Sequence, residues 1–252
     1  MTTYLKVFDV WEGQLEINET ELKNGGVKGL IIRLNDMAGG HHMDSYFLNQ
    51  WKQAGDGGFL RAPYFVYNPW NTGVENFDWL MGNCPHEVNT ICVDVEVRKT
   101  DYPSTTYASQ YAAFMSRAQQ HFHKVVTYTG GWFVPYLSYW PTTCEYWWAR
   151  YPGSLYPATR ETWTWAKLDG VLSGLSWNPG LAPGHVSLWQ CSGDRIILPG
   201  TIRANDINIF NGTEDQLKEW FGGFYIPVSA DPLTLESLDR RIKVIESRLA
   251  IL

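Results

Sequence analysis

Short apolar runs alternate with amphipathic stretches through the first half of the chain. Eight runs have the length and β-branched composition of strands, at 5–10, 29–34, 62–67, 90–97, 124–128, 147–151, 186–191 and 207–210. The sequence predicts helices over 18–23, 45–54 and 104–121 and a short helical turn at 77–81. Such alternation is typical of βαβ units around a parallel sheet. The second half has more strands and longer loops, so the pattern predicts an α/β fold, an irregular TIM-like (β/α) barrel of about eight strands that is degenerate in its second half.

The run at 90–97 carries two acidic residues. Because side chains alternate along a strand, Asp94 and Glu96 are expected on one face, with Val93, Val95 and Val97 on the other. Their Cα atoms would lie about 7 Å apart. Charge is costly to bury, so this face is expected to line a cleft, where paired carboxylates can hydrolyse glycosidic bonds. The alternative is that both acids are ion-pair partners at the end of a strand.

Other polar residues also fall where predicted strands end. Asp9, Arg33, Asn68 and Tyr128 join Asp94 and Glu96 in this group. In a barrel of parallel strands, the active site lies at the carboxyl ends of the strands. The sequence therefore predicts one site that contains both the acids and these neighbours.

The amino-acid composition limits the classes of molecule that the protein is expected to bind. The 13 Trp, 14 Tyr and 11 Phe include several in loop-like segments, and exposed aromatic rings suit sugar rings. A net charge of −6 without a basic block weighs against nucleic acid. The sequence shows neither a signal-peptide pattern nor a membrane-spanning run, so we expect synthesis in the cytoplasm without a signal peptide.

The histidines and cysteines lack the spacing of a metal site. His41-His42 and His121-x-His123 have no matching acid or cysteine, and the cysteines form no C-x-x-C pair, so neither a metal nor a cofactor is expected. Cys92 and Cys191 fall inside predicted strands and are expected to be buried thiols.

Taken in order, a series of short motifs resembles glycoside hydrolase family 25, the lysozymes of phages, bacteria and some fungi. Phe8-Asp9-Val10 resembles the opening strand of that family, and Asp94-Val95-Glu96 resembles its D-x-E signature. The remaining matches are Leu30-Ile31-Ile32-Arg33, Asp44 with Phe47, Val125-Val126-Thr127-Tyr128-Thr129, Trp148-Ala149-Arg150-Tyr151, Leu188-Trp189-Gln190-Cys191 and Asp206-Ile207-Asn208-Ile209-Phe210-Asn211-Gly212.

The resemblance implies an N-acetylmuramidase that cuts the β-1,4 bond after N-acetylmuramic acid in peptidoglycan glycan strands. Glu96 would be the general acid, with a raised pKa, and Asp94 would stay ionised and orient the 2-acetamido group of the substrate. Asp9 and Asp206 would complete a ring of carboxylates. The residues expected to contact the sugars are Arg33, Tyr64, Tyr67, Tyr128, Trp147, Tyr151, Trp189 and Gln190.

The chain departs from the family pattern at three places. Trp11-Glu12 replaces the usual Ser and His after the first Asp, Tyr64-Phe65-Val66 replaces Y-H-F, and Arg33 replaces a common Lys. These changes bear on sugar specificity. The alternative functions are a non-catalytic glycan-binding or structural part of a phage particle on the same barrel, and, less favoured, a chitinase-like glycosidase.

The composition changes near residue 222. We expect a catalytic barrel over 1–222, a linker over 223–232 and an amphipathic helix over 233–252. Apolar residues within 235–252 recur every three or four positions, which favours a short parallel coiled coil and a homo-oligomer; a helix packed back on the barrel is the alternative. Such a protein would act on the bacterial cell wall after lysis-type release, or as part of a phage particle.

Overall fold

The computed structural model describes residues 4–36 and 41–223. Its centre is a closed barrel of eight strands in the order β11-β1-β2-β5-β6-β7-β8-β10, with β10 pairing back to β11. The strands are β1 (Leu5–Val10), β2 (Val27–Arg33), β5 (Leu60–Val66), β6 (Thr90–Asp94), β7 (Lys124–Gly130), β8 (Glu145–Ala149), β10 (Val186–Ile197) and β11 (Asn205–Phe210). The predicted fold class and strand number are therefore confirmed.

Neighbouring strands are parallel from β1 round to β10, whereas β11 runs antiparallel to both of its neighbours. The start of β11 therefore lies at the same end of the barrel as the carboxyl ends of the other strands. Two short strands, β3 (Asn35–Asp36) and β4 (His42–Met43), form a separate hairpin, and β9 (Glu161–Thr162) pairs with β10 outside the ring.

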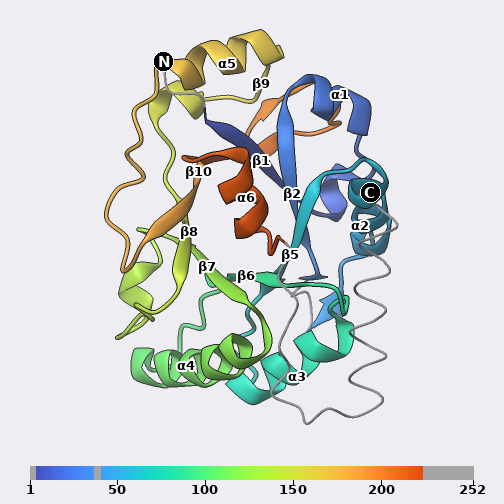
Figure 1. The fold of residues 1–252 in the computed structure, drawn as a ribbon. Coiled ribbons are helices and arrows are strands. Elements are labelled where there is room, and N and C mark those ends of the chain that lie inside the picture. The colour runs from blue at the N-terminus through green and yellow to red at the C-terminus, as the bar shows by residue number, and fades with distance from the viewer. Residues whose placement is uncertain (1–3, 37–40, 224–252) are drawn as a thin grey trace.

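Helices cover the outside of the barrel (Figure 1). They are α1 (Glu19–Asn24), α2 (Phe47–Asp56), α3 (Gly73–Asn83), α4 (Ser104–His121) and α5 (Trp165–Ser173). Single 3₁₀ turns at Glu12–Gln14, Val134–Tyr136 and Gly153–Leu155 lie in the loops that follow β1, β7 and β8. The alternation of side chains divides the core in two. Phe65 and Val93 belong to the outer cluster beneath the helices, whereas Tyr64 and Cys92 belong to the cluster inside the barrel.

The last described helix, α6 (Glu214–Trp220), closes the amino-terminal end of the barrel. In Figure 1 it lies across the ring of strands. The Thr90 hydroxyl donates to the Trp220 carbonyl (2.8 Å), and Phe221 packs so closely on Gly29 that a Cβ there would lie 2.6 Å from its ring. This opening is therefore filled, and the opposite end carries the acidic residues.

Several predicted elements differ in extent. The central strand ends at Asp94, three residues early, and Val97 packs against the interior cluster instead of sharing the outer face with Val93 and Val95. The short helical turn expected around 77–81 is the longer α3, which begins at a Thr72/Glu75 capping box. Helices α5 and α6 were not predicted. Of the linker expected over 223–232, only Gly223 is described. The helix over 233–252 and the oligomer through 235–252 lie outside the described residues.

Candidate active site

Four acidic side chains gather at the open end of the barrel. Asp9 stands near the end of β1, Asp94 ends β6, Glu96 follows two residues later, and Asp206 opens β11. Asp9 and Asp206 are direct partners in the β1–β11 ladder. The predicted acidic ring is therefore present. Asp9 and Asp94 are buried, at 4% and 7% exposure, whereas Glu96 reaches solvent.

One oxygen of Asp9 accepts two amide hydrogen bonds. Asn208 Nδ2 donates to Asp9 Oδ2 at 2.8 Å, and Gln190 Nε2 donates to the same atom at 3.1 Å. Burial and the neighbouring Asp206 carboxylate raise the pKa of Asp9 well above its ordinary value, and the two amides oppose that rise. Any proton that Asp9 carries is therefore directed to its other oxygen.

The orientation of both amides follows from their further partners. The Trp147 indole N–H donates to Asn208 Oδ1 at 2.6 Å. Because an indole nitrogen can only donate, the carbonyl of this amide must face Trp147, and its NH2 must face Asp9. Gln190 is held similarly, since its Oε1 accepts from the hydroxyls of Tyr128 (2.8 Å) and Tyr151 (2.7 Å).

Asp206 is held by a backbone irregularity in β10. The β10–β11 register shifts between Ser192 and Ile196, and Asp194 within this bulge has a positive φ of 52°. Its backbone N–H donates to Asp206 Oδ1 at 2.7 Å. Burial raises the pKa of Asp206 to about 6, and this hydrogen bond limits the rise.

Asp94 and Glu96 also resist ionisation. Burial, then Glu96 and Asp9, raise the pKa of Asp94 well above its ordinary value, while Arg33 opposes the rise. Asp94 Oδ1 is buried and accepts no hydrogen bond from the described residues. Partial desolvation, then Asp206, raises the pKa of Glu96 to about 7. Glu96 thus fits the expected acid. The raised pKa of Asp94 runs against its expected ionised state, because burial and the neighbouring acids disfavour its charge.

The departures in the first two strands form one cluster. Arg33 Nε donates to Asp44 Oδ2 (2.6 Å), its Nη2 lies 3.0 Å from Glu12 Oε1, and its guanidinium lies 4.9 Å from the Trp11 ring centre. Asp44 also accepts the backbone N–H groups of Glu12 and Tyr46. Trp11 and Glu12 therefore hold Arg33 in place, and the cation acts on the site through its charge.

Three of the predicted aromatic contacts line the interior beside the acids. Tyr64 stands 6.0 Å from the Trp147 ring and Tyr128 stands 4.4 Å from it, measured between ring centres. Burial raises the pKa of both Tyr64 and Tyr128 well above its ordinary value, and the charges on Asp9 and Asp94 add to the rise, so both hydroxyls lie within electrostatic reach of the acids. Tyr151 reaches the same group through Gln190.

Tyr67 and Trp189 were predicted wrongly as sugar contacts. Tyr67 is completely buried outside the barrel, where its ring stacks on Tyr107 of α4 at 5.8 Å. Trp189 is 2% exposed, belongs to the same outer cluster and donates its indole N–H to the Arg150 carbonyl. Each directly follows a residue that points into the barrel, Val66 or Leu188, and therefore points outward.

The sequence reasoning missed Asn208 and an aromatic row beyond Tyr151. Asn208 follows Asp206 at a spacing of two, so strand alternation alone puts both on the inner face. The rings of Tyr151 and Tyr156 stack at 4.9 Å, and half-exposed Trp132 lies 6.0 Å from Tyr151. This row extends from the acids to the surface, and only the folded loops bring it together.

Metal-ligand groups, membrane-spanning helices and cysteines were assessed for the described residues only. They include no group of three or more His, Cys, Asp or Glu side chains arranged to hold a metal ion. No helix in residues 4–36 and 41–223 is long and apolar enough to cross a membrane. Cys92 and Cys191 are free and buried, as predicted.

The barrel and the sequence were compared with solved structures, curated proteins and family models. Solved structures with the same fold include a lysozyme from Streptomyces coelicolor (17% identity, TM-score 0.67, covering 88% of this chain and 98% of that one) and a muramidase from Trichobolus zukalii (19%, 0.65, 86% and 98%). A family 25 lysozyme from Aspergillus fumigatus is similar at 17% identity and TM-score 0.63, with coverage of 87% and 99%. A search of curated proteins found no match. The family model described as Glycosyl hydrolases family 25 matches residues 8–169, more than half of the sequence. The chain therefore belongs to this family and is a glycoside hydrolase.

Proposed function

We propose that this glycoside hydrolase is a muramidase, which cleaves the β-1,4 bond between N-acetylmuramic acid and N-acetylglucosamine in bacterial peptidoglycan. The observation that carries the proposal is the difference between Glu96 and its neighbours. Glu96 reaches solvent with a pKa of about 7, whereas Asp9 and Asp94 are buried. A group that still holds a proton near neutral pH and can meet a substrate is suited to be the general acid. The similar structures named lysozyme or muramidase support the same substrate class.

In the proposed reaction, Glu96 donates its proton to the glycosidic oxygen as the bond breaks. The 2-acetamido oxygen of the substrate attacks the anomeric carbon from the other face, and Asp94 accepts a hydrogen bond from the acetamido N–H. That N–H would supply a donor to a carboxyl group whose Oδ1 has none. This hydrogen bond would favour the ionised form of Asp94 and would oppose the effect of burial on its pKa.

The remaining residues would keep this arrangement in place. Asp9 and Asp206 surround the reacting pair with charge, and the amides of Gln190 and Asn208 hold Asp9. Tyr64 and Tyr128 would contact the sugar at the cleavage point. Trp147, expected as a third contact, is 1% exposed and would support the rings of both tyrosines from behind. We propose that Tyr151, Tyr156 and Trp132 extend the glycan platform outward, because exposed aromatic faces bind sugar rings well.

Digestion of purified peptidoglycan, with mass spectrometry of the released fragments, tests the proposal. We expect fragments with N-acetylmuramic acid at the reducing end. The Glu96→Gln variant should release them about 10²- to 10⁴-fold more slowly, because it cannot supply the proton. Wild-type rates from a folded Glu96→Gln protein would contradict the role of Glu96. No release by the wild type from several wall types, together with binding to them, would favour the non-catalytic alternative. We further propose that the enzyme meets the wall after lysis-type release or within a phage particle.

A further inference from the structure

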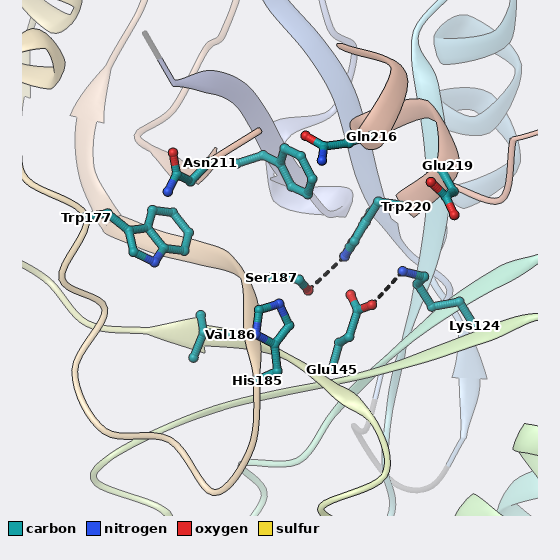
Figure 2. Close-up of a pocket in the computed structure, with 11 residues that line it drawn as sticks. Lys124, Glu145, Trp177, His185, Val186, Ser187, Asn211, Gln216, Glu219 and Trp220 are labelled. Carbon is teal, nitrogen blue, oxygen red and sulfur yellow. Dashed lines mark hydrogen bonds and ion pairs between the residues drawn. The ribbon is translucent and has the colours of Figure 1, made fainter. Parts of the chain in front are cut away.

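The closed end of the barrel carries a second, polar pocket. It encloses about 340 Å³ and is lined by Lys124, Glu145, Trp177, His185, Val186, Ser187, Phe210, Asn211, Gln216, Glu219 and Trp220. Figure 2 shows Trp177 and Asn211 on one side and Glu219 and Lys124 on the other. The volume lies at the lower end of the range for small-molecule pockets, about 300–1,000 Å³.

This pocket is separate from the acidic site, although the same strands build both. β7 begins at Lys124 in the pocket and carries Tyr128 in the acidic site, four residues later. Four residues of strand span roughly 13 Å. Completely buried Val126 stands between them, inside the barrel. One sugar cannot occupy both sites, and the filled barrel prevents a glycan from threading through it.

Opposite charges largely cancel in the pocket. Lys124 Nζ lies 2.7 Å from Glu145 Oε1, and this pairing contributes to lowering the pKa of Glu145. Glu219 adds a further carboxylate on the rim. An anionic ligand would find Lys124 already paired with Glu145, and the carboxylate of Glu219 would repel it. The lining therefore disfavours an anion, and its amide, hydroxyl and carboxylate groups offer a neutral ligand both donors and acceptors of hydrogen bonds.

The aromatic part of the lining is firmly held. The Trp177 ring packs 6.0 Å from Tyr4 and 5.8 Å from Trp189, and it is partly exposed to the pocket. Trp220 is fixed because its indole N–H donates to Ser187 Oγ at 2.9 Å. A rigid indole beside amide and carboxylate side chains is the combination that accommodates the apolar face and the hydroxyl edge of a pyranose ring.

We propose that this pocket is a secondary glycan-binding site that takes a neutral N-acetylhexosamine unit and tethers the enzyme to the wall while the open end cuts. The proposal rests on the proposed function for its substrate class but uses none of the catalytic residues. It predicts that the pocket matters for insoluble peptidoglycan, which is long enough to reach both ends of the barrel, and not for short soluble fragments.

The test compares the full-length wild type with Trp177→Leu and Asn211→Ala. Trp177→Leu keeps an apolar contact for Tyr4, and Asn211→Ala changes an exposed side chain. Sedimentation measures binding to insoluble peptidoglycan, and kcat/KM is measured on short soluble glycan fragments. We expect each variant to bind the insoluble wall roughly fivefold more weakly or worse, with unchanged kcat/KM on soluble fragments. Leu48→Ala, at an exposed position on α2, should match the wild type in both assays.

A direct probe separates this proposal from the catalytic one. Tri-N-acetylchitotriose is titrated into the Glu96→Gln protein, and the indole N–H signals are followed by NMR, with Trp177 assigned by its loss in the Trp177→Leu variant. A shift of the Trp177 signal supports the site even if the protein cleaves nothing. An unmoved Trp177 signal, or variants that bind the insoluble wall as well as the wild type, would overturn it. Equal losses on soluble and insoluble substrates would overturn it too, because the pocket would then act through the fold.

Discussion

Asn208 and Trp147 together decide which face of an amide meets Asp9. The indole N–H of Trp147 donates to Asn208 Oδ1 at 2.6 Å, so that Asn208 Nδ2 must point to Asp9 Oδ2, 2.8 Å away. The Trp147 indole, which can only donate a hydrogen bond, thus helps to position Asp9 through the Asn208 amide. This chain of contacts makes the first prediction.

Replacing Asn208 by Leu should lower the free energy of unfolding by about 1–3 kcal/mol, because it leaves the buried Trp147 N–H without an acceptor and removes a donor from Asp9. Trp147→Phe should weaken the same chain. Chemical denaturation of both single variants and the double variant forms a double-mutant cycle, in which we expect coupling of roughly 0.5–3 kcal/mol. Additive effects would show that Trp147 does not act through Asn208.

Activity should depend on pH through Glu96. Its pKa is raised to about 7, so the acid is protonated below that pH and loses its proton above it. We expect kcat/KM to fall about tenfold per pH unit on the alkaline side. The Asp206 charge helps to raise this pKa, so Asp206→Asn should move the alkaline limb to lower pH. Asp215→Asn, which changes an exposed carboxylate on α6, should leave the limb in place. A limb that does not respond to Asp206 would contradict this coupling.

The charge and the shape of Arg33 should have separable effects. The Arg33 charge opposes the raised pKa of Asp94, so Arg33→Met should raise that pKa further and move the acid limb of kcat/KM to higher pH. Arg33→Lys keeps the charge and should keep the limb. Both variants should cost stability, roughly 1–3 kcal/mol, because neither rebuilds the contacts with buried Asp44 and with Glu12. pH–rate profiles and denaturation curves measure the two effects independently.

Tyr64 on β5 and Tyr67 just after it should respond differently to removal of the hydroxyl group. Tyr67→Phe should leave kcat/KM unchanged and stability equal or higher, because the Tyr67 hydroxyl is buried and unpaired among the described residues. Tyr64→Phe removes a hydroxyl beside the acids and should lower kcat/KM roughly twofold to tenfold. Steady-state kinetics with thermal melts compare the pair. Loss of activity in Tyr67→Phe would contradict its position outside the barrel.

The strand pattern in the sequence predicts most of the fold. Its alternation of side chains also assigns individual residues to the inner or outer face of the barrel, beyond those that the sequence analysis assigned. Tyr64 and Val66 face inward, so Tyr67 must face outward, and the same reasoning sets Trp189 opposite Gln190. Alternation also puts Asn208 with Asp206. The faces of Tyr67, Trp189 and Asn208 can therefore be predicted by applying strict alternation along each strand. Short α5 and α6 were harder to recognise, because a short helix draws much of its stability from packing.

By itself, the sequence determined the order of the eight barrel strands, the alternation of side chains along them and the presence of acids at strand ends, because burial leaves a periodic pattern along the chain. Only the tertiary structure decided how those acids influence one another, since the pKa of Glu96 depends on burial and on Asp206, which lies 110 positions away in β11. It also decided the orientation of the Asn208 amide and the polar pocket under the barrel. Both depend on how β11 closes the ring and α6 seals it, which no local pattern encodes.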